Sequence, residues 1–200
     1  MLSRIPYKYL HAAILIPLVI LLTDTGYVHA RLFKDHPVES KHWTDEYDRY
    51  FKKYSKRYFG PLFNWHWFKA QAIAESALDH KAESHVGARG LMQIMPGTFS
   101  DISKQNPHFS KLDVPKWNIA AGIYYDRTLY RKFEQTSAQD KLYMTFASYN
   151  AGYGRILSAH KRTGSKTKKW NKIEPFLPLE TQGYVKRIRK LMGEYEQELD

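Results

Sequence analysis

Apolar residues recur at spacings of three and four along most of the chain beyond residue 40, and this helical period is the feature that most constrains the fold. The clearest case is the stretch 44–58, where Lys and Arg occupy one face and aromatic residues the other, namely Tyr47, Tyr50, Phe51, Tyr54 and Tyr58. Gly60 and Pro61 are expected to end this helix. No alternating strand pattern longer than four residues occurs, and no internal repeat. The sequence therefore predicts an all-α, mainly helical fold.

Four further helices are expected. One covers residues 63–78, with Trp67, Ala70, Ile73, Ala74 and Ala77 on its buried side. Another, covering residues 115–133, begins with a proline suited to the first helical turn. A third follows the stretch 137–140, whose Ser and Asp have the spacing of a capping box, and the last covers residues 180–197. Between them, residues 161–172 carry six Lys or Arg and predict a basic loop, either solvated and mobile or anion-binding.

Composition excludes several classes of protein. With 43% hydrophobic and 15% aromatic residues, the chain has ample material for a core, which excludes wholesale disorder. It has no cysteine, which excludes disulfide scaffolds, Cys-ligated zinc, iron–sulfur clusters and thiol nucleophiles. His80 and His85 are five residues apart and lack the helical spacing of a zinc pair. We therefore predict no metal site and no cofactor.

The first 30 residues resemble an export signal. Two basic residues precede an apolar run from Ala12 to Leu22, which as a helix spans about 17 Å, short of a hydrocarbon core of about 30 Å. Val28 and Ala30 suit a cleavage site. Residues 1–30 are thus predicted to be a signal peptide, with an uncleaved membrane anchor as the alternative, and the rest to lie in the periplasm or cell envelope. Residues 31–62 are expected to form an N-terminal helical extension, and residues 63–197 the main domain.

One carboxyl group stands out chemically. Glu75 lies near the end of the predicted Ala- and Ile-rich helix, where loss of hydration favours the neutral acid and raises the pKa. A glutamic acid with a raised pKa can donate a proton to a leaving group at neutral pH. The apolar segment after it contains Gly87 and Gly90, which permit tight turns, and Gln93, which supplies a donor and an acceptor. If the helix continued, Asp79 would share a face with Glu75 as a second carboxylate.

Four blocks of this sequence resemble the soluble-type lytic transglycosylases, family 23 of the glycoside hydrolases. The first block consists of Glu75-Ser76, Ser84, Gly87-Ala88, Gly90-Leu91-Met92-Gln93, Met95-Pro96 and Thr98. The later blocks follow in the family's order: Asn118, Gly122 and Tyr125; Tyr149-Asn150-Ala151-Gly152; and Glu180-Thr181 with Tyr184-Val185. The resemblance covers roughly residues 64–190. It implies a lysozyme-like helical domain with a substrate groove.

The resemblance also implies roles for residues of the first block. Glu75 would be the single catalytic acid/base. Ser84 and Gln93 would lie in the substrate cleft near the sugar's N-acetyl or lactyl groups, and Met95 would line the cleft beside the reacting sugar. Leu91 and Met92 are better interpreted as core residues than as site residues.

The later blocks would supply the other wall of the site. Tyr149 would approach Glu75 across the cleft, and Asn150 would fix the loop that carries it. Glu180 and Tyr184, from the last helix, would complete the wall of the groove.

The implied reaction is cleavage of the β-1,4 bond between N-acetylmuramic acid and N-acetylglucosamine in peptidoglycan, with formation of 1,6-anhydromuramoyl ends. A hydrolytic muramidase of the goose-lysozyme kind shares the fold and the single Glu, and the sequence barely separates the two. A non-catalytic peptidoglycan-binding module is the other alternative. The same motifs fit an enzyme of general wall turnover, an enzyme that acts with a secretion system and an enzyme of a phage.

The formal net charge of +11 indicates a polyanionic partner. Nucleic acid is not predicted as that partner, because no nucleic-acid-binding motif appears and export argues against it. Peptidoglycan glycan strands with their acidic stem peptides are the expected partner, with association to a membrane through residues 1–30 as a further expectation.

If surface charge drives this association, added salt is expected to weaken binding of the protein to purified sacculi, since salt screens exposed charges beyond about 10 Å. Sedimentation of sacculi with bound protein across a salt series would measure it. Binding that does not change with salt would contradict the electrostatic interpretation.

Overall fold

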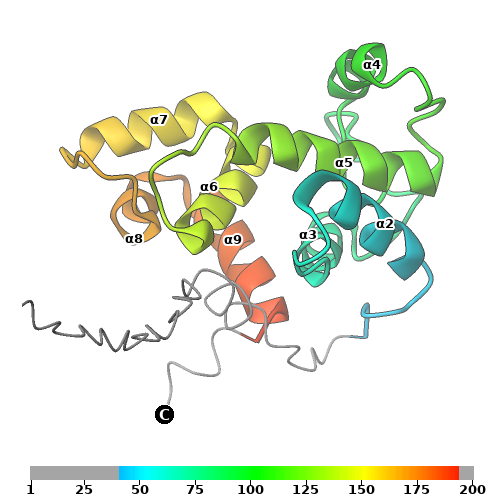
Figure 1. Cartoon of the computed structure of the whole chain (residues 1–200), viewed down its shortest axis with the longest axis horizontal. Coiled ribbons are helices and arrows are strands. Elements are labelled where there is room, and N and C mark those ends of the chain that lie inside the picture. Colours follow the sequence, from blue (N-terminus) through cyan, green and yellow to red (C-terminus); the bar gives the residue numbers. More distant parts are fainter. Residues whose placement is uncertain (1–40, 194–200) are drawn as a thin grey trace, which may run out of the picture.

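The computed structural model describes residues 41–193, which form helices joined by short turns (Figure 1). The elements are α2 (Asp48–Phe59), α3 (His66–Ser76), α4 (Pro96–Gln105), α5 (Pro115–Tyr130), α6 (Ala138–Ala151), α7 (Tyr153–Arg162), α8 (Trp170–Ile173), the 3₁₀ turn η1 (Glu174–Phe176) and α9 (Leu179–Leu191). Extended pairing within residues 41–193 is limited to isolated bridges that join Arg89 to Glu83 and to Ile94. The predicted all-α class is confirmed.

Helices α3, α5 and α6 form the centre of the molecule. Seven consecutive residues of α3 (67–73), six of α5 (118–123) and seven of α6 (142–148) are buried, so each helix is covered on all sides over about two turns. Helices α2 and α4 pack on α5, α7 and α9 pack on α6, and α3 contacts both α2 and α9. In Figure 1, α4 lies at one edge of the molecule and α7 and α8 at the other.

Three predicted helix boundaries agree closely with the structure. Gly60, with a φ of 96°, follows the last residue of α2, and Pro115 begins α5. Ser137 caps α6, because its Oγ accepts a hydrogen bond of 3.0 Å from the backbone N–H of Asp140.

Helix α3 is shorter than predicted. It ends at Ser76, because Ala77 and Leu78 both adopt left-handed backbone conformations with φ of 56° and 63°. Asp79 is therefore off the helix and exposed, and its Oδ1 accepts from the backbone N–H of Lys81. The alternative in which Asp79 shares a helical face with Glu75 is wrong.

Sequence reasoning missed α4, α7, α8 and η1. Helix α4 contains Gly, Thr and Ser, which favour helices weakly, and α7 begins directly after Gly152. The prediction that residues 161–172 form one continuous loop is wrong, since the first two residues of this stretch end α7 and its last three lie in α8. Burial of Ile156 and Trp170 stabilises these short helices, and this depends on tertiary contacts.

Residues 1–40 and 194–200 lie outside the described residues. The signal peptide or anchor, the first part of the N-terminal extension and the end of the last helix therefore stay predictions. Within residues 41–193, no helix combines the length and apolar character that crossing a membrane requires. Phe51 and Tyr54 of α2 are buried in the core, so the described part of the extension packs directly on the main domain.

The segment 82–94, which follows α3, is held by one buried amide. Asn118 of α5 accepts from the backbone N–H of Met92 at 2.8 Å and donates to the carbonyls of Arg89 and Leu112 at 2.9 and 3.2 Å. A Cβ at Gly90 would lie 2.5 Å from Asn118 Nδ2, and a Cβ at Gly122 would lie 2.8 Å from Met92. Both glycines are therefore required for close approach of this segment, called here the loop 82–94, to α5.

Gly90→Ala is expected to destabilise the fold by about 3 kcal/mol or more, since it adds a clash with a hydrogen-bonded amide to the strain of a positive φ. Gly87→Ala is the matched control, because Gly87 also has a positive φ (85°) but nothing lies near its Cβ position, and it should lose only about 1–2 kcal/mol. Urea unfolding of the two variants measures the difference. Equal losses would show that the contact with Asn118 does not constrain the loop.

Candidate active site

Glu75 is the next-to-last residue of α3 and is partly buried. Burial raises the pKa of its carboxyl group from 4.5 to about 7, and a hydrogen bond from Tyr184 opposes part of this rise. The C-terminal end of a helix carries partial negative charge, which also disfavours a carboxylate there. The raised pKa expected from the sequence is confirmed.

Tyr184 contacts Glu75 directly. Its hydroxyl donates a hydrogen bond of 2.6 Å to Glu75 Oε1, across 109 positions of sequence, and joins α9 to the end of α3. Burial and the nearby Glu75 raise the pKa of Tyr184 well above its usual value, so it remains a neutral donor. The bond uses Oε1, so Oε2 is the oxygen that can carry the proton of the neutral acid.

Tyr149 holds the loop 82–94 in place. Its hydroxyl donates to the carbonyl oxygen of Met92 at 2.7 Å, and Ser76 Oγ donates to the neighbouring carbonyl of Leu91 at 2.9 Å. Tyr149 lies close enough to Glu75 for the charge of Glu75 to raise the tyrosine pKa further, although burial is the larger cause. Tyr184, not Tyr149, therefore makes the hydrogen bond to Glu75.

Ser84 and Gln93 shape the same loop. Ser84 Oγ accepts from the backbone N–H of Ala88 at 2.9 Å. Gln93 has a φ of 44°, and its Nε2 donates to the carbonyls of Ala82 and Gly90 at 3.1 and 3.0 Å. Both amide hydrogens of Gln93 are thus used within the loop. The Ser84 hydroxyl can still donate to a ligand, and Gln93 Oε1 can still accept from one.

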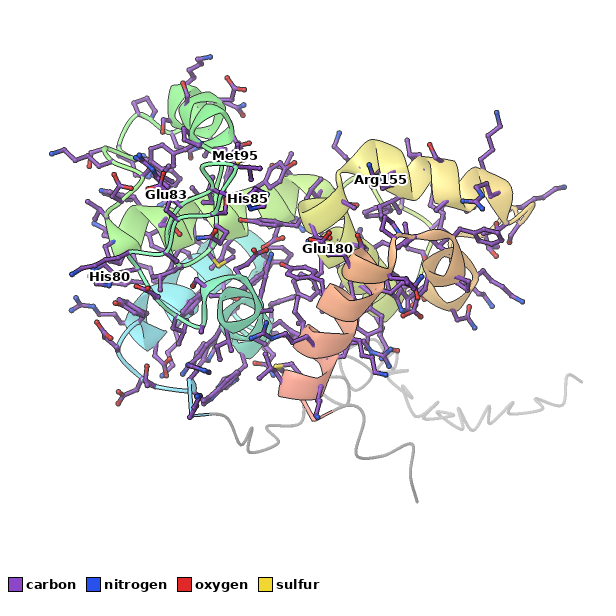
Figure 2. All side chains as sticks on the ribbon, turned by 180° about the vertical axis from the view of Figure 1, so that it is seen from behind. His80, Glu83, His85, Met95, Arg155 and Glu180 are labelled. Carbon is purple, nitrogen blue, oxygen red and sulfur yellow. The ribbon has the colours of Figure 1, made fainter. Side chains whose placement is uncertain are left out.

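Met95 and Glu180 are both exposed and lie apart from one another (Figure 2). Met95 is exposed where the loop 82–94 meets α4, and His85 lies on the same side (Figure 2). Glu180 is exposed in the first turn of α9. Glu180 is also one helical turn before Tyr184, so both share a face of α9.

Asn150 links the end of α6 to the start of α9. Its Oδ1 accepts a hydrogen bond of 2.8 Å from the hydroxyl of Thr181. The bond fixes the beginning of the helix that carries Glu180 and Tyr184. Asn150 therefore acts on the position of α9.

Sequence reasoning missed a second carboxyl group near Glu75. Asp126 of α5 is completely buried, and its Oδ1 accepts a hydrogen bond of 3.3 Å from Nε2 of Gln71, which is also completely buried. Gln71 precedes Glu75 by one turn of α3. The sequence signal that could have revealed this pair is a single polar residue, Gln71 or Asp126, within each of two mostly apolar helical stretches.

The site thus combines one accessible acid with neutral hydrogen-bond donors. Loss of hydration favours the protonated form of Glu75 at neutral pH, and Tyr184 fixes its orientation. In the described part of the chain, no group of three or more His, Asp or Glu side chains is placed to hold a metal ion. The arrangement is suited to general acid/base chemistry.

Comparison with known proteins gives one family. The family described as "Transglycosylase SLT domain" matches residues 50–172. The "Soluble lytic murein transglycosylase" of Escherichia coli is 36% identical over 126 residues, which are 60% of this chain and 19% of that protein. The "Membrane-bound lytic murein transglycosylase F" of Photobacterium profundum is 29% identical over 157 residues, 76% of this chain and 28% of that protein.

Solved structures agree with the sequence comparison. The 70 kDa soluble lytic transglycosylase of Escherichia coli superposes with a TM-score of 0.64 at 29% identity, over 78% of this chain and 25% of that one. An inactive mutant of lytic transglycosylase Slt from Pseudomonas aeruginosa gives a TM-score of 0.64 at 26% identity, with the same coverage. The chain spans less than a third of the length of these relatives.

Glu75→Gln is expected to stabilise the fold at neutral and alkaline pH. The pKa of Glu75 is higher in the folded state than the unfolded value of 4.5, so the folded state binds more protons and loses stability as pH rises from about 4.5 through about 7. Glutamine is never ionised and avoids this loss, which amounts to about 3 kcal/mol at high pH. Unfolding curves at about pH 4 and pH 8 should show equal stability at the lower pH and a more stable variant at the higher. A difference that is independent of pH would contradict the raised pKa.

Proposed function

The chain belongs to the Transglycosylase SLT domain family, and from that premise we propose that it is a lytic transglycosylase that cleaves peptidoglycan glycan strands. The observation that carries the proposal is the geometry of Glu75, a partly accessible carboxyl group with a pKa of about 7, held by Tyr184. The relatives described above are named lytic murein transglycosylases, and this supports the same activity. This chain matches only part of the length of those relatives, so its substrate and its partners are proposed here together with its activity.

In the first step, protonated Glu75 donates its proton to the oxygen that links C1 of N-acetylmuramic acid to N-acetylglucosamine. The C1–O bond breaks and the N-acetylglucosamine end leaves as an alcohol. The positive charge that develops at C1 is stabilised by the 2-acetamido group of the same sugar. A second protein carboxylate is therefore not needed as a nucleophile.

In the second step, Glu75 is ionised and acts as a base. It removes the proton from the C6 hydroxyl of the muramoyl residue while that oxygen bonds to C1. The product is a 1,6-anhydromuramoyl end, no water is consumed, and Glu75 returns to its protonated form. One residue with a pKa near neutrality serves both steps, because it must give and regain the same proton.

Other predicted site residues fit supporting roles. Ser84, Gln93 and Met95 would contact the sugar from the loop 82–94 and the start of α4, and Glu180 would contact it from α9. Tyr149 and Asn150 would hold the two sides in position through Met92 and Thr181. We place the reaction in the cell envelope, where peptidoglycan lies.

The products released from purified sacculi test the proposal. Mass spectrometry should find disaccharide-peptides about 18 Da lighter than their hydrated forms, as loss of one water requires. Hydrated reducing ends would instead indicate a goose-type muramidase. Binding to sacculi without any released fragment would indicate a peptidoglycan-binding module.

Glu75→Gln should lower the rate of fragment release by about 10²–10⁴-fold, because the amide cannot donate or accept the proton. Binding to sacculi is expected to persist, since the side chain keeps its shape. Asp79→Asn is a matched control, because Asp79 is exposed and off the helix, and it should retain wild-type activity. Full activity of the Glu75 variant would overturn the assignment.

Tyr184→Phe should move the alkaline limb of the kcat/KM profile to higher pH. The tyrosine hydroxyl stabilises ionised Glu75, so its removal raises the pKa of the acid above about 7. Tyr149→Phe is the control, since that hydroxyl bonds to Met92 and not to Glu75, and its limb should stay in place. A limb that is unchanged in Tyr184→Phe would contradict the proposed link between the two residues.

A further inference from the structure

Two completely buried side chains, Gln71 and Asp126, form a polar contact beneath Glu75. Gln71 Nε2 donates to Asp126 Oδ1 at 3.3 Å and thereby joins α3 to α5. Both residues are 0% exposed, so neither touches solvent or substrate. Gln71 lies one helical turn before Glu75, on the same face of α3.

The contact is incomplete if Asp126 is a carboxylate. Asp126 Oδ2 and Gln71 Oε1 are both buried, and neither has a hydrogen-bond partner among the described residues. Both oxygens are then acceptors, and two buried acceptors cannot satisfy each other. A single proton on Asp126 Oδ2 turns that atom into a donor for Gln71 Oε1, which satisfies both atoms at once.

We propose that Asp126 is a neutral carboxylic acid that forms a ring of two hydrogen bonds with the Gln71 amide, and that this pair positions Glu75. In the ring, Gln71 Nε2 donates to Asp126 Oδ1, and Asp126 Oδ2 donates to Gln71 Oε1. The pair anchors the last turns of α3 on α5 without placing a charge next to Glu75. The positioning role rests on the proposed function; the protonation state does not.

The electrostatic surroundings agree with a neutral Asp126. The titratable groups near it are Glu75 on α3, Tyr149 on α6, Tyr184 on α9 and Tyr125 on its own helix. None of these can supply a positive charge. Burial and the negative charge of ionised Glu75 raise the pKa of Asp126 well above its usual value, and the Gln71 bond offsets this in part.

A neutral Asp126 also explains how Glu75 can titrate near neutrality. If Asp126 were ionised, its charge would oppose ionisation of Glu75 and raise the pKa of Glu75 further. Glu75 would then be a poor base for the second step. The ring therefore provides hydrogen bonds between the two helices while it leaves Glu75 free to exchange its proton.

The protonation state is tested by infrared spectroscopy of the purified protein at about pH 8, where accessible carboxyl groups are ionised. In a Glu75→Gln background, a carbonyl band of a protonated carboxylic acid is expected, and Asp126→Asn in the same background should remove it. This measurement does not depend on catalytic activity. A spectrum without such a band would overturn the neutral state.

The effect on Glu75 is tested with Asp126→Asn alone. Asparagine can form the same ring, so the Glu75 titration, followed by its infrared carboxylate band, should keep its midpoint near 7. If Asp126 carries a charge, the substitution removes it and the midpoint falls. That fall would overturn the proposal, whether or not the protein is active.

The positioning role is tested with Asp126→Leu, because a leucine fills the buried space without a charge but cannot form the ring with Gln71. The expected result is a loss of about 10–100-fold in kcat with KM little changed, and recovery of kcat in Asp126→Asn. A folded Asp126→Leu protein with wild-type kcat would overturn the positioning role. If the wild type releases no fragments, the proposed function fails, and the two infrared measurements still decide the state of Asp126.

Discussion

The side-chain amide of Asn118 is the interaction on which the candidate site depends. Its three hydrogen bonds fix the backbone of Arg89, Met92 and Leu112 against α5. These hydrogen bonds hold Asn118 so close to the loop that no room remains for a Cβ at Gly90. Without the Asn118 amide, the buried backbone N–H of Met92 would lose its partner, and the loop 82–94 would lose these hydrogen bonds to α5.

Hydrogen bonds from three other helices complete the arrangement around the loop. Tyr149 of α6 and Ser76 of α3 donate to the adjacent carbonyls of Met92 and Leu91, while Tyr184 of α9 donates to Glu75. Helices from distant parts of the sequence therefore meet at the end of α3. Glu75 lies where their polar groups converge. Among residues 41–193, burial and the Tyr184 hydrogen bond are the causes that shift its pKa, and burial is the larger.

The loop also shows how one side chain can hold the backbone and still keep a polar atom available. Gln93 uses both amide hydrogens to hold the loop and still has its oxygen for a ligand. Its left-handed backbone, with a φ of 44°, and those of Ala77 and Leu78 are unfavourable for residues other than glycine. These conformations persist because the surrounding hydrogen bonds and packing determine them.

The sequence by itself determined the helical class, most long helices, the capping by Ser137 and the raised pKa of Glu75, because these depend on local spacing and local polarity. It did not determine that α3 ends at Ser76, since two left-handed residues there have no local signature. Short helices such as α7 also escaped prediction, because buried contacts rather than propensity stabilise them. The contacts of Glu75 with Tyr184, and of Gln71 with Asp126, join residues 109 and 55 positions apart. Only the packing of α3 against α9 and α5 decides such pairs, because sequence spacing carries no information about which distant polar groups share a buried space.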